Sequence, residues 1–333
     1  MENLHPNWGL IDLHLHLDGS LSVASVRELA AMASIPVPAS DEELLEKLQV
    51  SKDCRDLNEY LEKFDFPCSL MQTEPAITTA VYNLLEELKS QGLLYAEIRF
   101  APQLHTLRGL TQTQVVRAAV AGLEKSDFKA NLILCCMRGR DNGDANLETI
   151  RVAAEFLGRG VCAADLAGAE ALFPTESFLE LFRVAVERKI PLTIHAGEAA
   201  GPESVWSALE CGARRIGHGV RALEAPALTD HLAKDGIVLE LCPTSNLNTN
   251  IFPDMPSYPL RKLMDAGVKV TVNTDNMTVS GVTLRSEMDQ MIQTFALTEP
   301  EIRGLLHNSA EGSFAEPSVK AWLHDRIDTA NFH

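Results

Sequence analysis

Eight short segments with the character of buried strands recur along this chain, and helical segments separate them. The strands are expected at residues 11–17, 92–104, 130–137, 161–167, 191–195, 215–220, 237–242 and 269–274. Most of these segments are nearly continuous apolar runs, which are typical of strands buried on both faces of a parallel sheet. Eight strand-helix units predict an α/β fold, and more specifically a closed (β/α)8 TIM barrel.

The connection after the first strand is long, and it is itself helical in pattern. Helices are expected there at residues 22–33, 41–48, 57–71 and 78–91, and later at 111–125, 146–157, 176–188, 203–211, 226–235, 259–266, 283–295 and 298–310. We therefore predict one domain over residues 1–333, with a helical lid insertion at about 34–91. The apolar face of segment 57–71 carries Tyr60, Leu61 and Phe64. It fits a helix packed on the barrel and a lid over a pocket equally well.

Charge and cysteine usage restrict the partners and the compartment. The net charge is −17, with 29 Lys and Arg against 46 Asp and Glu. This balance argues against nucleic acid or an anionic membrane as a partner and is compatible with a neutral or cationic small substrate. Seven scattered cysteines without a C-x-x-C pair are typical of reduced thiols. With no signal peptide and no apolar run of membrane-spanning length, a cytoplasmic protein is expected.

Histidines gather where such a barrel carries its chemistry, at the carboxyl ends of the strands. The period of the first strand places His14 and His16 on the same side. His195, His218 and Asp275 end the fifth, sixth and eighth strands, and Asp165 lies in the fourth. Four of the ten histidines therefore meet on one face, which predicts a metal site.

Three histidines and one aspartate, namely His14, His16, His195 and Asp275, suffice for a divalent ion with an open position. Nitrogen and carboxylate donors without thiolate favour one Zn²⁺ per chain over iron, nickel or manganese. Zinc lowers the pKa of a bound water to about 7, which provides a nucleophile near neutral pH.

Two further side chains are candidates for catalysis. Glu198, three residues after His195, is placed for proton transfer to or from a substrate; the alternative is a surface glutamate that caps the next helix. His218 stands between two glycines that would let substrate or water approach, so it could hydrogen-bond the attacking water. The alternative for His218 is a hydrogen-bonded core histidine.

Several motifs together resemble those of the adenosine deaminase family, in its bacterial type, in content and order. They are His14-Leu-His16-Leu-Asp18-Gly19, Asp165-Leu-Ala-Gly168, His195-Ala-Gly-Glu198, Ile216-Gly-His218-Gly219, Pro243-Thr-Ser-Asn246 and Thr274-Asp275. The resemblance extends over about residues 10–310. It implies zinc-dependent hydrolysis of adenosine and 2′-deoxyadenosine to inosine and 2′-deoxyinosine plus ammonia, in purine salvage.

The resemblance also implies a role for each matching position. The four predicted metal ligands match the family's zinc ligands, Glu198 matches the residue that protonates purine N1, and His218 matches the one that orients and helps deprotonate water. Substrate contacts are implied for His16, Asp18, Gly168 and Asn276, and an apolar lid for Tyr60, Leu61 and Phe64.

Two positions depart from the family pattern and affect the substrate more than the reaction. Asn276 stands where a second Asp is common, and Ala169 where many relatives are acidic. Adenine, aminodeoxyfutalosine or an N6-modified adenine compound are therefore alternative substrates, although few positive charges near the motifs argue against a nucleotide. A lactonase or amidase would need a bridging lysine that the middle strands lack, and a non-catalytic protein would not need Glu198. The oligomeric state stays open, with a homodimer as one option.

Overall fold

Eight parallel strands form the centre of this computed structural model, which describes residues 8–51 and 53–330. They are β1 (Ile11–His16), β2 (Tyr95–Phe100), β3 (Lys129–Met137), β4 (Val161–Ala167), β5 (Thr193–Ala196), β6 (Arg215–His218), β7 (Val238–Leu241) and β8 (Lys269–Val272). The hydrogen-bonded order is β1-β2-β3-β4 and β5-β6-β7-β8. Bridges between Ala164 and Leu192 and between Leu15 and Asp275 join the two runs at both edges, so the sheet closes. The predicted (β/α)8 barrel is confirmed.

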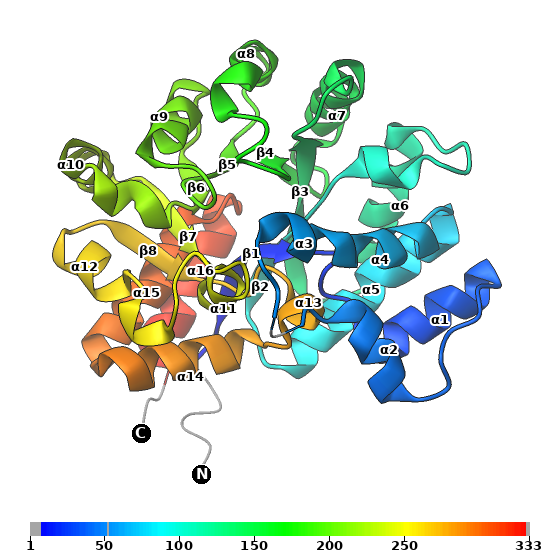
Figure 1. Cartoon of the computed structure of the whole chain (residues 1–333), viewed down its shortest axis with the longest axis horizontal. Helices are drawn as coiled ribbons and strands as arrows, with labels where there is room; N and C mark the ends of the chain where they lie inside the picture. The colour runs from blue at the N-terminus through cyan, green and yellow to red at the C-terminus, as the bar shows by residue number, and fades with distance from the viewer. Residues whose placement is uncertain (1–7, 52, 331–333) are drawn as a thin grey trace.

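Helices surround the strands on the outside (Figure 1). They are α5 (Glu74–Ser90), α6 (Gln112–Glu124), α7 (Gly143–Phe156), α8 (Leu179–Glu187), α9 (Pro202–Glu210), α10 (Pro226–Asp235), α12 (Leu260–Asp265), α14 (Leu284–Phe295), α15 (Glu299–Gly312) and α16 (Pro317–Thr329). Because the helices cover the outer face and side chains fill the interior, β2 and β4 are buried at every position. This double burial explains the continuous apolar runs of the sequence.

The connection from β1 to β2 contains α1 (Val23–Ala33), α2 (Asp41–Leu48), α3 (Leu57–Leu61), α4 (Asp65–Leu70) and α5, so the predicted insertion at about 34–91 would begin after α1. The helix predicted over 57–71 is broken, because a 3-10 turn (Glu62–Phe64) separates α3 from α4. Tyr60 packs with Cys54 and Val279, and its hydroxyl lies 2.8 Å from Ser280 Oγ. This segment therefore packs against the region that follows β8.

Several predicted boundaries were wrong for local reasons. The second strand ends at Phe100 rather than 104, since Pro102 has no N–H to donate and begins a 3-10 turn. Helix α5 begins four residues early because the Thr73 side chain caps it and Pro75 fits its first turn. Three helices were not predicted: the short α11 (Pro243–Asn248) and α13 (Met277–Ser280), and α16, which buries only Leu323 and Ile327.

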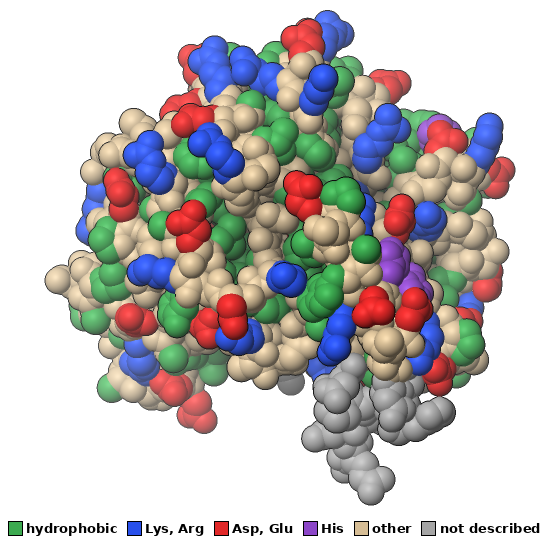
Figure 2. Space-filling model, turned by 180° about the vertical axis from the view of Figure 1, so that it is seen from behind, with side chains coloured by type: hydrophobic (Ala, Val, Ile, Leu, Met, Phe, Trp, Pro, Cys, Tyr) green, Lys and Arg blue, Asp and Glu red, His purple; other side chains and the backbone are tan. Residues whose placement is uncertain are grey.

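Within the described part of the chain, none of the helices combines the length and the apolar character needed to cross a bilayer. On the face of the molecule shown in Figure 2, acidic and basic side chains alternate over the surface.

Candidate active site and metal centre

Four donor side chains converge at the carboxyl ends of β1, β5 and β8. Asp275 Oδ1 lies 3.3 Å from Nε2 of His14 and 3.3 Å from Nε2 of His16. The Nε2 atoms of His16 and His195 are 3.2 Å apart. Three nitrogens and one oxygen thus surround a common point, as the ligands of a single ion do.

The chemistry of these donors fits a divalent ion. His14 Nε2 is buried and has no hydrogen-bond partner in the described part of the chain. Burial lowers the pKa of His16 and of His195, so both rings are neutral at pH 7 and offer lone pairs. Neutral imidazoles with one carboxylate suit zinc and its transition-metal neighbours.

His218 belongs to the same cluster. One donor atom from each of His14, His195, His218 and Asp275 lies within 4.8 Å of the others. His218 also faces Glu198, with 3.7 Å between its Nε2 and Glu198 Oε2. It therefore lies between the metal donors and the candidate acid.

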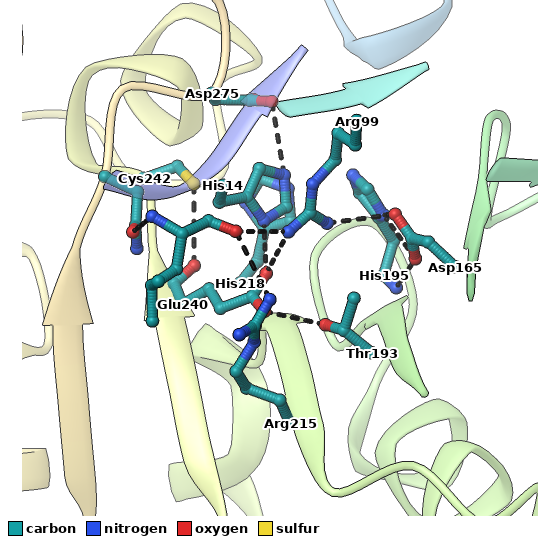
Figure 3. Close-up of polar contacts among 12 residues, drawn as sticks. His14, Arg99, Asp165, Thr193, His195, Arg215, His218, Glu240, Cys242 and Asp275 are labelled. Carbon is teal, nitrogen blue, oxygen red and sulfur yellow. Dashed lines mark hydrogen bonds and ion pairs between the residues drawn. The ribbon is translucent and has the colours of Figure 1, made fainter. Parts of the chain in front are cut away.

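A buried ionic network holds two of the predicted metal ligands, His14 and His195, from behind (Figure 3). Glu240 Oε2 accepts from His14 Nδ1 at 2.7 Å, and Asp165 Oδ2 lies 2.9 Å from His195 Nδ1. Arg99 joins the two carboxylates, at 2.7 Å from Glu240 and 2.9 Å from Asp165. Hydrogen bonds to the outer nitrogens of ligand histidines fix the tautomer and the orientation of each ring.

Arg99 and Glu240 received no role in the sequence analysis. Burial opposes ionisation of Glu240, but the guanidinium groups of Arg215 and Arg99 hold its pKa well below its usual range. The one indication in the sequence was a charged residue inside an otherwise apolar buried strand, which needs a partner because an unpaired buried charge is costly.

Backbone conformation aims the donors at the centre. His218 and Asp275 have φ values of 60° and 61°, which are uncommon for residues other than glycine. Gly217 is needed for packing, because a Cβ there would lie 3.0 Å from His14 Cε1. This glycine makes room for a metal donor, whereas the sequence analysis had assigned that space to substrate or water.

A cavity of about 530 Å³ opens beside the donor cluster. Among the predicted site residues, its lining includes His16, Asp18, Tyr60, Leu61, Phe64, Gly168, His195, Glu198, His218, Asp275 and Asn276. His14 lies behind this wall and contributes to the donor cluster. Much of the remaining lining is apolar, and its carboxyl side chains are Asp18, Asp65, Glu198 and Asp275. The described lining contains no Lys or Arg.

Glu198 is buried, with 4% of its surface exposed, so the alternative of a surface glutamate is excluded. The cap of α9 is Gly201, whose N–H bonds Glu203. Burial, followed by the negative charges of Asp275 and Glu170, raises the pKa of Glu198 well above its usual range. The carboxyl therefore holds a proton more readily than an exposed glutamate does, as a proton donor requires.

Asp18 and Asn276 present polar atoms on the same side of the cavity. The Cys68 thiol donates to Asp18 Oδ2 at 3.4 Å, and burial raises the pKa of Asp18 to about 6. Asp18 Oδ1 and Asn276 Oδ1 have no hydrogen-bond partner among the described residues. Asn276 Oδ1 also fills the space beside Gly19, where a Cβ would lie 1.9 Å from it.

Together, the barrel and this site define a hydrolase of the TIM-barrel, metal-dependent type. A sequence model described as adenosine deaminase matches residues 10–330. The chain belongs to the adenosine deaminase family.

Curated relatives and solved structures agree with this assignment. The chain is 50% identical to adenosine deaminase of Haemophilus ducreyi, covering 95% of this chain and 94% of the relative. It is 37% identical to adenosine deaminase of Enterococcus faecalis, covering 96% of each. The crystal structure of adenine deaminase from Arthrobacter aurescens is similar, with a TM-score of 0.86, 28% identity and coverage of 96% and 98%. The N6-methyl-AMP deaminase of Arabidopsis thaliana shares the fold, with a TM-score of 0.83, 23% identity and coverage of 98% and 97%.

Proposed function

We propose that this chain hydrolyses adenosine and 2′-deoxyadenosine at C6, releasing inosine or 2′-deoxyinosine and ammonia in purine salvage. The observation that carries the proposal is one cavity that brings the buried Glu198 carboxyl, whose pKa is raised by burial, next to the donor cluster. In this reaction the oxygen of water bonds C6 and the C6–N bond breaks. One hydrogen of the water would replace the proton that Glu198 gives to purine N1, and the other leaves with the ammonia.

In this proposal Glu198 supplies the proton for N1. A protonated carboxyl is required, because a carboxylate could accept a proton from the ring but could not donate one. Protonation of N1 withdraws electrons from C6 and makes it a better electrophile. Burial of Glu198 favours its protonated carboxyl over the carboxylate, because a buried charge loses its hydration.

His218 would orient the attacking water. Tyr258 donates to Asn246 Oδ1 at 3.1 Å, and the Asn246 amide lies 3.1 Å from His218 Nδ1. Donation from this amide places the proton of neutral His218 on Nε2, the atom that faces the cavity side near Glu198. Burial lowers the pKa of His218 well below its usual range, so the ring is neutral at pH 7. An N–H at this point can hold the water oxygen and stabilise negative charge on it. In this tautomer Nε2 cannot also take the proton of the water, so the help in deprotonation that the resemblance implied does not fit.

His14, His16, His195 and Asp275 would hold one divalent ion per chain, and their donor types favour Zn²⁺. When bound, such an ion supplies a Lewis acid that lowers the pKa of a coordinated water to about 7.

The charges of the cavity favour a nucleoside over a nucleotide. A 5′-phosphate carries about two negative charges and requires Arg or Lys for binding, whereas the charged lining residues are all acidic. In this proposal Asp18 would accept a hydrogen bond from a sugar hydroxyl, and Asn276 would bond a ring nitrogen. Adenine, aminodeoxyfutalosine and N6-modified adenine compounds remain the alternative substrates.

Tyr60, Leu61 and Phe64 would close an apolar lid over the bound purine. Phe64 already lies beside the donor cluster, with 6.2 Å between its ring centroid and that of His16. We assign residues 34–91 to this insertion and the whole chain to one catalytic domain in the cytoplasm.

The test is the loss of adenosine absorbance on conversion to inosine, measured with and without a chelator. Adenosine, 2′-deoxyadenosine, adenine, AMP and N6-methyladenosine are compared at equal concentration. We expect turnover of the two nucleosides, loss of turnover with chelator, and at least 100-fold lower kcat/KM for AMP. Absence of adenosine turnover by the zinc-loaded protein would reject the proposal.

A further inference from the structure

A second glutamate lies behind Glu198, and neither the composition of the cavity nor the family motifs assign it a role. Glu170 follows β4, is 1% exposed and does not line the cavity. Its carboxylate receives the backbone N–H groups of four consecutive residues after β5: Gly197 at 2.7 Å, Glu198 at 3.1 Å, Ala199 at 2.7 Å and Ala200 at 3.0 Å. The Ser204 hydroxyl adds a fifth contact at 2.5 Å.

The backbone N–H groups of residues 197–200 find no hydrogen-bond acceptor within their own segment. Gly197 has a φ of 69°, which turns the chain so that successive N–H groups point to one side. Such a concave run of amides is an anion-binding nest, and here a side chain of the same molecule fills it. Charge-assisted bonds of this kind are about twice as strong as neutral ones.

The Glu170 contacts continue to a metal donor. Ser204 Oγ lies 2.8 Å from Thr175 Oγ1, which accepts from Arg138 at 2.9 Å. Arg138 also donates to the backbone carbonyl of His195 at 2.6 Å. Arg138, which follows β3, and Glu170, which follows β4, therefore hold the two ends of the stretch from His195 to Ala200.

We propose that Glu170 is a positioning residue for the reaction, which fixes the backbone of Glu198 so that its carboxyl lies at the bound purine. This inference rests on the proposed role of Glu198. It also explains why Ala169, a departure from the family pattern, leaves the site intact. The contacts to the loop come from Glu170, while the Ala169 carbonyl accepts from the local turn at Leu172 and Phe173.

The conservative substitution Glu170→Gln tests the proposal. Both carboxylate oxygens face donors, so either orientation of the Gln amide sets its NH2 group against at least one backbone N–H. A loosened loop moves the acid away from N1 and leaves the rest of the cavity unchanged. We expect kcat to fall about 10- to 100-fold, while KM and the dissociation constant of inosine change less than about threefold. The exposed Glu176→Gln, with the same chemical change six residues away, should behave as wild type.

Hydrogen exchange supplies a readout that does not depend on turnover. In Glu170→Gln the amides of residues 197–200 should exchange at least 10-fold faster, while those of β6 and β7 keep their rates. Exchange at 197–200 equal to wild type would overturn the proposal, as would kcat within threefold of wild type. So would a loss of activity that only matches a loss of folded protein.

If Glu170→Gln does not fold, Ser204→Ala provides the same test at smaller amplitude, because it removes one contact of five. Faster exchange at 197–200 with kcat lowered about threefold supports the proposal, and wild-type behaviour in both overturns it. If the wild-type protein does not deaminate adenosine, the proposed function fails. The exchange result still decides whether Glu170 holds the loop.

Discussion

Glu240→Gln tests how far the buried ionic network supports the stability and the metal affinity of the site, beyond what the predicted metal ligands supply by themselves. The side chain keeps its shape but loses its charge. Its oxygens bond His14 Nδ1 and Arg99 on one side, and the Thr193 hydroxyl and Arg215 on the other. All four partners are donors, so the new NH2 group must face at least two of them.

The expected magnitude follows from what each partner retains. Removing one member of a buried ion pair costs about 3–5 kcal/mol. Arg99 keeps Asp165 and Arg215 keeps Glu97, so neither cation is left alone and the lower end applies, about 3 kcal/mol. A chain of 333 residues has an unfolding entropy of roughly 0.7 kcal/mol per kelvin. Tm should therefore fall by about 4 °C, and metal affinity by about 10- to 100-fold because the ring of His14 loses its orienting carboxylate.

Calorimetry of metal-free protein measures the first effect, and competition with a chromogenic chelator measures the second. Thr193→Val is the control, because it removes one donor to Glu240 and leaves the His14 contact in place. Its metal affinity should equal that of wild type. Wild-type Tm and metal affinity in Glu240→Gln would refute the view that this carboxylate supports the site.

Four further outcomes are expected. Glu198→Gln should lower kcat by about 10²- to 10⁴-fold, because an amide cannot give its proton to N1. In wild type the raised pKa of Glu198 means that the acid form is present at low pH and is lost as pH rises through that pKa. A profile of kcat/KM should fall on its alkaline side, and a fall only on the acidic side would contradict this. Burial raises the pKa of Glu287 to about 7, against 4.5 in the unfolded chain. Between these two pH values the folded state binds more protons than the unfolded state, so the folded state loses stability as pH rises. Glu287→Gln should therefore match wild type at pH 4 and exceed its unfolding free energy by about 3 kcal/mol at pH 8, as denaturant titrations can show. Finally, chelation should lower the unfolding free energy by about 4 kcal/mol relative to protein with zinc at 1,000 times its Kd, as thermal scans can measure.

The positions of the four predicted metal ligands could be derived from the sequence, because the order of strands and helices alone determines which strand ends meet in the barrel. His14, His16, His195 and Asp275 each lie at or near the carboxyl end of an apolar strand, and parallel strands bring their carboxyl ends to one edge. The same reasoning placed Glu198 and His218 at this edge, where the structure has them, and their catalytic roles stay predictions. Local periodicity also placed most helices, but it missed α16, which has few apolar positions, and the break after α3, where a 3-10 turn interrupts an apolar face.

Strand order and apolar periodicity in this chain thus determine that a barrel forms and at which edge imidazoles and carboxylates meet. Tertiary structure decided which distant charges support them. Arg99 joins carboxylates from β4 and β7, and Glu170 binds amides that follow β5. No local sequence pattern encodes these pairings. A buried charge needs a partner, and closure of the barrel brings that partner close. The number of residues between the two partners in the sequence does not reveal that they are in contact.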